Sequence, residues 1–314
     1  MFDNLISFFL IAGFGVFFQW KKPGDINPDV ARHVINTTVI RFFLPMLCFK
    51  VIATASIDKN TVLLPLAAII TIFFTILISF IVYTMIGKIA TLRKEEKGAL
   101  ILGSSFGNVT FLGLLFLIGL YGQDAAKYVL LYDLLATAPL LFFAGSAIAA
   151  YYGRGQKLTI KENFKVVAEL PPIWALVAGF AVNFSGITLP SFLLTTLELM
   201  SMPIAPLMIF SIGLALSFPK LKHAIIAMPA VIIKLCVAPI ISFGLAFFFG
   251  MDGLAIKSVV MESAMPTMVL TLALSSQHKL DHNLSSFLII FTTAVALVTL
   301  PLTACLVSVF KTVS

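Results

Sequence analysis

The chain has 314 residues, of which 60% are hydrophobic and only 11% are charged, and its formal net charge is +7. A soluble domain carries about 25% charged residues, so this chain has too few polar side chains to cover a water-exposed surface. The composition excludes a soluble enzyme, a secreted disulfide scaffold and a nucleic-acid-binding protein. It predicts an all-α integral membrane protein whose surroundings are the lipid bilayer.

Apolar runs separated by turn residues and charges predict ten membrane-spanning helices, since a helix needs about 20 apolar residues to cross a bilayer. Numbered in chain order, the spans are expected at 4–20, 30–54, 62–87, 96–120, 125–152, 166–184, 192–217, 222–250, 254–277 and 284–310. Lysine and arginine are concentrated in the loops that follow the odd-numbered spans. By the positive-inside rule these loops are cytoplasmic, and both termini lie outside.

The two halves of the chain share a proline pattern. Four prolines of the first half have partners 161 to 164 residues later: Pro28 with Pro190, Pro45 with Pro206, Pro65 with Pro229, and Pro139 with Pro301. The pattern predicts two five-helix repeats, 1–152 and 166–314, joined by a cytoplasmic loop at 153–165. Because five is odd, the copies run through the membrane in opposite senses, an arrangement typical of secondary transporters.

Spans 4 and 9 each contain a polar stretch that disfavours a helix, at 103–110 and 262–267. Glycine loosens a helix and proline removes a backbone donor, so we expect both spans to break near the middle of the bilayer. Non-helical backbone at that depth is tolerated only inside protein or beside a wet cavity. The prediction is a binding centre where the two breaks cross; ordinary kinks are the alternative.

Ionisable side chains inside the spans need a partner or a task, because they are costly in lipid. Glu262 is the candidate ligand for a coupling ion, or the protonatable group that carries a coupling proton. The alternative is a structural salt bridge between Glu262 and Lys234. Lys234 and Arg41 are the candidates for binding a substrate carboxylate, although Arg41 could equally be structural. Asp133 faces either this centre or the outer water, and Lys50 is expected to reach the outer interface.

Other kinds of site have no support in the sequence. His278 and His282 are four residues apart but lack a third metal ligand nearby, so no metal site is expected. A phosphate-binding loop and hydrolase motifs are absent from the sequence, which argues against an ATP-driven pump and an enzyme. No cofactor is expected beyond a coupling sodium ion or proton.

Several motifs resemble the auxin efflux carrier family, in its bacterial form with a short central loop. They are Asn36 with Leu44-Pro45, Phe106-Gly107-Asn108 with Phe111-Leu112-Gly113, Pro206 with Ile212-Gly213 and Leu216, Ile233-Lys234-Leu235 with Pro239, and Met265-Pro266. The resemblance implies a permease for auxin-like or dicarboxylate anions such as malonate, located in a bacterial inner membrane with both termini on the periplasmic side. It also implies a scaffold of spans 1, 2, 6 and 7 beside a transport unit of spans 3–5 and 8–10.

The expected fold is also similar to that of bile acid–sodium symporters. In that family a Ser/Thr-Asn pair in span 4 and a glutamate in span 9 help to bind sodium. Here Gly107-Asn108 and Glu262 occupy comparable places. Gly107 supplies no hydroxyl and Pro266 replaces a side-chain ligand, which argues against a full two-sodium site unless Thr110 and Thr137 substitute.

The sequence therefore predicts a secondary active transporter of a small organic anion that works by alternating access and is coupled to a sodium or proton gradient. The predicted substrate-binding residues are Asn108, Thr110, Arg41, Lys234, Met265, Pro266 and Thr267, and the predicted coupling-ion residues are Glu262, Asn108, Asp133 and Thr137. The alternative is a membrane ligand sensor without net transport. Assembly as a homodimer is left open.

Overall fold

The computed structural model describes residues 2–89, 91–154, 159–215, 224–251 and 253–309. These residues are helical apart from turns, linkers and one isolated backbone bridge. Parts of four predicted segments lie outside the described residues: the ends of spans 7, 8 and 10 at 216–217, 222–223 and 310, and loop residues 155–158.

The first half of the chain contains one 3₁₀ turn (η1) and four π-helical segments (η2 to η5) among its α-helices. The elements are α1 (Phe2–Lys21), η1 (Pro23–Asp25), α2 (Pro28–Thr38), η2 (Val39–Phe43), α3 (Leu44–Ala53), α4 (Lys59–Ile89), α5 (Lys94–Ser105), η3 (Val109–Gly113), α6 (Leu114–Tyr121), α7 (Ala125–Tyr132), η4 (Asp133–Thr137), α8 (Ala138–Leu140), η5 (Leu141–Gly145) and α9 (Ser146–Tyr152).

The second half follows a similar course with one described π-helical segment, η7. Its elements are α10 (Ile160–Ala168), α11 (Pro171–Ser185), α12 (Ser191–Ser201), α13 (Ile204–Ala215), α14 (Ala224–Ile232), η7 (Ile233–Val237), α15 (Ala238–Phe248), α16 (Gly253–Ser263), α17 (Leu270–Gln277) and α18 (His282–Val309).

Six helical stretches within the described residues are long and apolar enough to cross a membrane: Pro28–Ala53, Lys59–Ile89, Ala125–Tyr152, Ser191–Leu214, Ala224–Phe248 and His282–Ser308. Two shorter apolar stretches, Val109–Tyr121 and Pro171–Ser185, accompany them. The chain is thus an all-helical membrane protein, as its composition indicates. The arrangement as ten spans in two inverted repeats stays a prediction.

The predicted central loop contains the start of a helix that the sequence analysis did not predict. Helix α10 begins within the segment 153–165, at Ile160, and ends before α11. The side chain of Thr159 accepts a hydrogen bond from the backbone of Glu162, and the Glu162 carboxylate accepts one from the backbone of Thr159. This reciprocal capping starts the helix.

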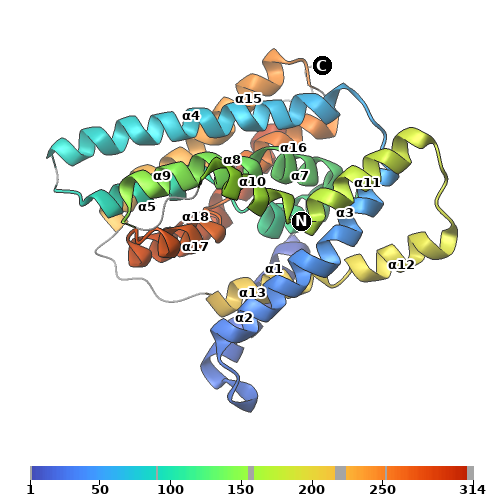
Figure 1. The fold of residues 1–314 in the computed structure, drawn as a ribbon, viewed down its shortest axis with the longest axis horizontal. Coiled ribbons are helices and arrows are strands. Elements are labelled where there is room, and N and C mark those ends of the chain that lie inside the picture. The colour runs from blue at the N-terminus through green and yellow to red at the C-terminus, as the bar shows by residue number, and fades with distance from the viewer. Residues whose placement is uncertain (1, 90, 155–158, 216–223, 252, 310–314) are drawn as a thin grey trace.

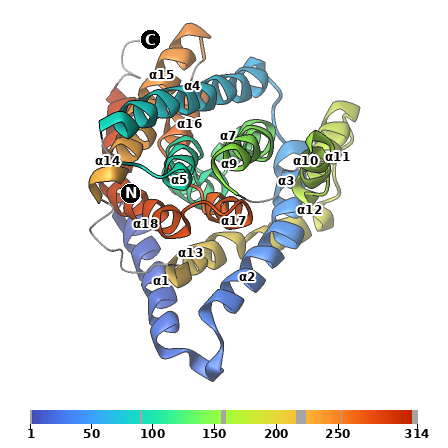
Figure 2. The same cartoon turned by 60° about the vertical axis from the view of Figure 1, so that its left-hand side comes forward.

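The helices of the predicted scaffold, α1–α3 and α11–α13, pack mainly on one another, and so do those of the predicted transport unit, α4–α9 and α14–α18. In Figure 2 the first group lies along the lower and right-hand sides of the second. Gly15 of α1 and Gly213 of α13 bring their backbones together, and a Cβ on Gly15 would lie 2.8 Å from the Gly213 Cα. Small residues allow this close packing of membrane helices.

Three of the π-helical segments end two residues before a proline and carry a charged residue. Arg41 lies in η2 before Pro45, Asp133 in η4 before Pro139, and Lys234 in η7 before Pro239. Proline lacks the N–H that continues an α-helix, and a single π-turn accommodates this with one additional residue. That residue rotates the side chains relative to a regular α-helix.

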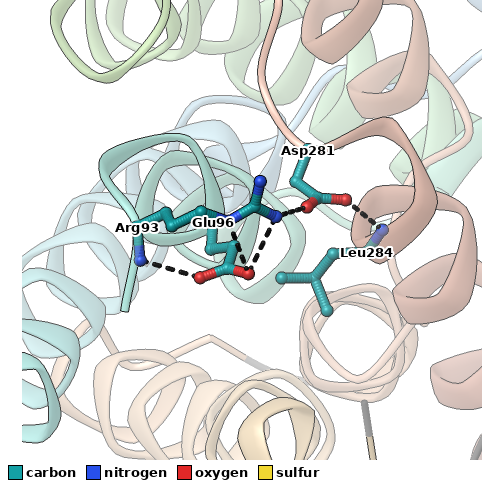
Figure 3. A network of polar contacts seen from close by, with 4 residues as sticks. All are labelled: Arg93, Glu96, Asp281 and Leu284. Atoms are coloured by element: carbon teal, nitrogen blue, oxygen red, sulfur yellow. Dashed lines mark hydrogen bonds and ion pairs between the residues drawn. The ribbon is translucent and has the colours of Figure 1, made fainter. Parts of the chain in front are cut away.

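Polar contacts fasten the N-terminal ends of α5 and α18 together (Figure 3). Arg93 donates to Glu96 from Nε at 3.0 Å and from Nη2 at 2.9 Å, and Nη2 also donates to Asp281. Asp281 in turn accepts a bond of 2.9 Å from the backbone N–H of Leu284. This network connects the ends of two helices of the predicted transport unit.

Candidate functional site

The two interrupted spans meet at their breaks. Helix α5 ends at Ser105 and α16 ends at Ser263, and the residues that follow run past each other as a short antiparallel pair joined at Gly107 and Thr267. The Asn108 N–H donates to the Pro266 carbonyl at 2.7 Å, and the Met268 N–H donates to the Phe106 carbonyl at 2.9 Å. Each break therefore satisfies backbone groups that the other leaves free, which allows non-helical backbone at this depth. Figure 1 shows α5 lying beside α17 and α18.

Buried hydroxyl groups fix this crossing. The Thr267 hydroxyl donates to the Gly103 carbonyl of α5 at 2.6 Å, and the Thr267 N–H donates to the Thr292 hydroxyl of α18 at 3.0 Å. Both threonines are buried. Thr267 is thus hydrogen-bonded to both α5 and α18, so the two breaks form one connected structure.

Three buried charged side chains surround the crossing. Lys234 is 3% exposed, Asp133 is 5% exposed and Glu262 is fully buried. The Lys234 ammonium donates a bond of 2.5 Å to the carbonyl oxygen of Ser263, the last residue of α16. Because the C-terminal end of a helix carries partial negative charge, this is a favourable place for a cation.

Three positions of the span 4 segment, each three residues apart, lie beside these three charged side chains. A Cβ on Gly107 would lie 2.9 Å from Cε and 3.0 Å from Nζ of Lys234. The Thr110 hydroxyl donates to the Asp133 carboxylate, and a Cβ on Gly113 would overlap both carboxylate oxygens of Glu262. Gly107 and Gly113 are thus small because charged side chains fill the space beside them.

Several polar atoms in this centre have no hydrogen-bond partner within the described residues: Asn108 Oδ1, Asp133 Oδ1 and both carboxylate oxygens of Glu262. Among those residues no ion pair joins Glu262 to Lys234, although Glu262 is within electrostatic reach of both Lys234 and Asp133. A buried carboxylate without a partner is costly. The centre is therefore suited to receive a proton, a cation or a ligand with donor groups.

The structure brings together most of the predicted site residues. Asn108, Thr110, Lys234, Glu262, Met265, Pro266 and Thr267 are all buried at or beside the crossing. Asp133 is also buried, so the alternative that it faces outer water was wrong. Thr137 is buried but donates to the Tyr132 carbonyl at 3.4 Å, within its own helix.

Two other charges lie away from the crossing. Arg41 is exposed on η2, which packs on α2, α3, α11 and α13, so the centre contains Lys234 as its buried cation within the described residues. Lys50 was expected only to reach the interface. Instead it donates a hydrogen bond to the Glu198 carboxylate of α12.

Sequence reasoning missed Gly113 and the Ser263 carbonyl as parts of the centre. Gly113 belongs to the motif Phe111-Leu112-Gly113, but nothing in the neighbouring sequence indicates that the Glu262 side chain fills the space beside it. The carbonyl of Ser263 becomes available only because α16 ends there. A helix end near an intramembrane lysine was the signal that could have been used.

Comparisons with known proteins identify the family of this chain. Residues 1–304 match the model of the family described as membrane transport protein. The chain is 29% identical over 284 residues to an uncharacterized transporter of Methanocaldococcus jannaschii, covering 89% of this chain and 90% of the relative. It is 28% identical over 282 residues to an uncharacterized transporter of Methanothermobacter thermautotrophicus, covering 85% and 86%. The chain therefore belongs to the membrane transport protein family, which is of the auxin efflux carrier type.

Proposed function

We propose that this transporter is a secondary active carrier of a small organic anion, auxin-like or a dicarboxylate such as malonate, which binds beside the crossing of α5–η3 and α16–α17. The observation that carries the proposal is the buried set of Lys234, Asp133 and Glu262 around two paired helix breaks. Charged groups at this depth in a membrane protein mark a pathway for substrates or ions. Asn108 and Thr110, together with the backbone at Met265 to Thr267, form the walls of the proposed site.

The balance of buried charge supports coupling to a cation. With every group ionised, two carboxylates face one ammonium, and a bound carboxylate substrate would add another negative charge. Uncompensated charge inside a low-dielectric protein costs several kcal/mol, so we infer that substrate enters with at least one proton or cation. Glu262, which has two unpartnered oxygens, is the proposed acceptor, with Asp133 as its neighbour.

The position of Lys234 favours a proton over sodium as the coupling ion. Carbonyl groups at a broken helix end are the ligands that transporters use for sodium. Here the carbonyl of Ser263 is already bound by the Lys234 ammonium at 2.5 Å. The Lys234 ammonium thus occupies the position beside the Ser263 carbonyl where a sodium ion would bind. A proton, in contrast, needs only one of the unpartnered carboxylate oxygens.

Alternating access would follow from the movement of the predicted transport unit against the scaffold. The main contacts between the two groups run from α3 to α7 and from α13 to η3. Because η3 follows Asn108 directly, a displacement of α13 against η3 would change access to the crossing. The paired breaks would travel with the transport unit as one body.

Uptake into proteoliposomes tests this proposal. The purified protein is reconstituted, and a panel of radiolabelled mono- and dicarboxylates is offered under an imposed proton gradient, a sodium gradient or a membrane potential. We expect accumulation of at least one carboxylate that depends on the proton gradient and persists without sodium. Saturable ligand binding with no flux under any gradient would favour the sensor hypothesis instead.

A further inference from the structure

A second candidate binding site lies apart from the crossing, between the predicted scaffold and transport unit. Here α1, α3, α12 and α13 on one side and η3, α6 and α18 on the other enclose a cavity of about 410 Å³. Cavities of about 300–1,000 Å³ accommodate small-molecule ligands. The cavity extends from Gln123, in a loop predicted to be outside, to Leu112 in η3, which begins directly after Asn108.

The lining of this cavity is apolar apart from one charged pair and a few neutral polar side chains. Lys50 and Glu198 are its only charged lining residues among those the structure describes. They form an ion pair between α3 and α12, and their side chains are 21% and 46% exposed. The pair is therefore accessible from the cavity, and an incoming anion can compete with Glu198 for the Lys50 ammonium.

We propose that this cavity binds a monocarboxylate with an apolar body, whose carboxylate replaces Glu198 on Lys50 while its apolar part lies against leucine side chains such as Leu112 and Leu115. A charge-assisted bond to the ammonium would supply orientation. A second carboxylate on the ligand would face apolar side chains, which is unfavourable. The site rests on the proposed function in one respect, since we place it on the path from the predicted outside to the crossing.

The alternative is that the ion pair is only a structural link between α3 and α12. The two hypotheses predict different effects of the charge variants on anion affinity. If the pair is structural, removing either charge has the same effect. If Lys50 is an anion receptor, Glu198→Gln frees the ammonium and tightens binding, whereas Lys50→Gln removes the receptor and weakens binding. Hydrogen bonds to charged groups contribute about 1.5–3 kcal/mol, so each change is expected to be about tenfold or more.

The test is calorimetric titration of the purified protein in detergent with hexanoate, with hexanamide as the uncharged probe and malonate as the dicarboxylate. We expect hexanoate to bind more tightly than either. Glu198→Gln should lower the hexanoate Kd about tenfold and Lys50→Gln should raise it about tenfold. Leu115→Trp, which fills the cavity and leaves the ion pair intact, should also raise it, and thermal melting identifies any variant that fails to fold.

Equal hexanoate and hexanamide affinities, or shifts of the same sign in the two charge variants, would overturn the site. Failure of the proposed transport is distinguishable from this result. Hexanoate binding with opposite shifts in Glu198→Gln and Lys50→Gln, but without flux of any anion, would leave the site standing and remove the transport function. Gradient-driven flux with unchanged hexanoate affinity in both variants would remove this site alone.

Discussion

The backbone N–H of Asn108 donates a 2.7 Å hydrogen bond to the carbonyl oxygen of Pro266. These residues are 158 positions apart, yet each lies in the break of its own helix. The bond joins the two helix breaks into one buried structure, because each break provides backbone hydrogen-bond partners for the other. Around that structure lie an ammonium and two carboxylates, and the following predictions test what they do.

Replacing Asn108 with alanine should weaken binding of the transported anion by about 10- to 100-fold, since a hydrogen bond to a charged group contributes about 1.5–3 kcal/mol. The Asn108 backbone bond to Pro266 is retained in this variant, so the crossing should persist. The measurement is equilibrium binding of the anion identified in the uptake panel. A Kd equal to that of the wild type would place the anion elsewhere.

Gly113→Ala should impair the centre, because the added Cβ would overlap the Glu262 carboxylate and lie 2.7 Å from its Cδ. Overpacking a buried site costs about 1–3 kcal/mol, and it would displace Glu262 from its neighbours. We expect lower thermal stability and reduced uptake. Gly244→Ala is the matched control, because its Cβ would meet nothing within 4 Å; equal behaviour of the two variants would contradict the packing around Glu262.

The contact between α1 and α13 offers a test of the fold away from the site. A Cβ on Gly213 would lie 2.9 Å from the Gly15 Cα and would overlap the Ala12 carbonyl oxygen. Gly213→Ala should therefore destabilise the protein by about 1–3 kcal/mol, measured by thermal melting in detergent. Gly13→Ala, on α1 two residues before Gly15, has open space at its Cβ and should melt like the wild type. A Gly213→Ala protein as stable as Gly13→Ala would mean that α1 and α13 do not cross there.

The pH dependence of stability should include a contribution from His278, which follows α17. Burial lowers the pKa of its imidazole, and both ring nitrogens lack partners within the described residues. The unfolded chain, with a His pKa near 6.5, binds this proton more readily than the folded protein. Stability should therefore fall as the pH drops below about 6.5.

His278→Gln removes this titration and should flatten the decline of the melting temperature between pH 7 and pH 5. His282 is exposed, so His282→Gln serves as the control and should keep the wild-type slope. A slope that is the same in all three proteins would show that His278 does not bind its proton differently in the folded and unfolded states.

The sequence predicted what local chemistry determines. The breaks at 103–110 and 262–267 follow from clustered glycine, serine and proline, and the capping pair Thr159 and Glu162 is a local signal for the start of α10. What could not be predicted depends on helix orientation. Arg41 and Lys234 both precede a proline in an apolar helix, yet one is exposed and the other is buried, because neighbouring helices and the additional residue of each π-turn decide which way a side chain faces.

Pairing between distant segments was the other limit. Lys50 and Glu198 are 148 residues apart, and a single sequence carries no signal that α3 and α12 are neighbours. The same holds for Gly113 and Glu262. Their proximity is a property of the crossing itself, which the sequence predicted as a meeting of two breaks but not in its side-chain detail.

The central claim is that an organic anion crosses the membrane together with a proton carried at Glu262. The most direct measurement is simultaneous recording of anion uptake and luminal pH in proteoliposomes, for the wild type and Glu262→Gln, with Glu169→Gln at an exposed position between α10 and α11 as the control. The account predicts luminal acidification in step with uptake in the wild type and the control, and loss of both proton movement and accumulation in Glu262→Gln. Anion accumulation without acidification in the wild type, or proton-linked accumulation that survives Glu262→Gln, would contradict it.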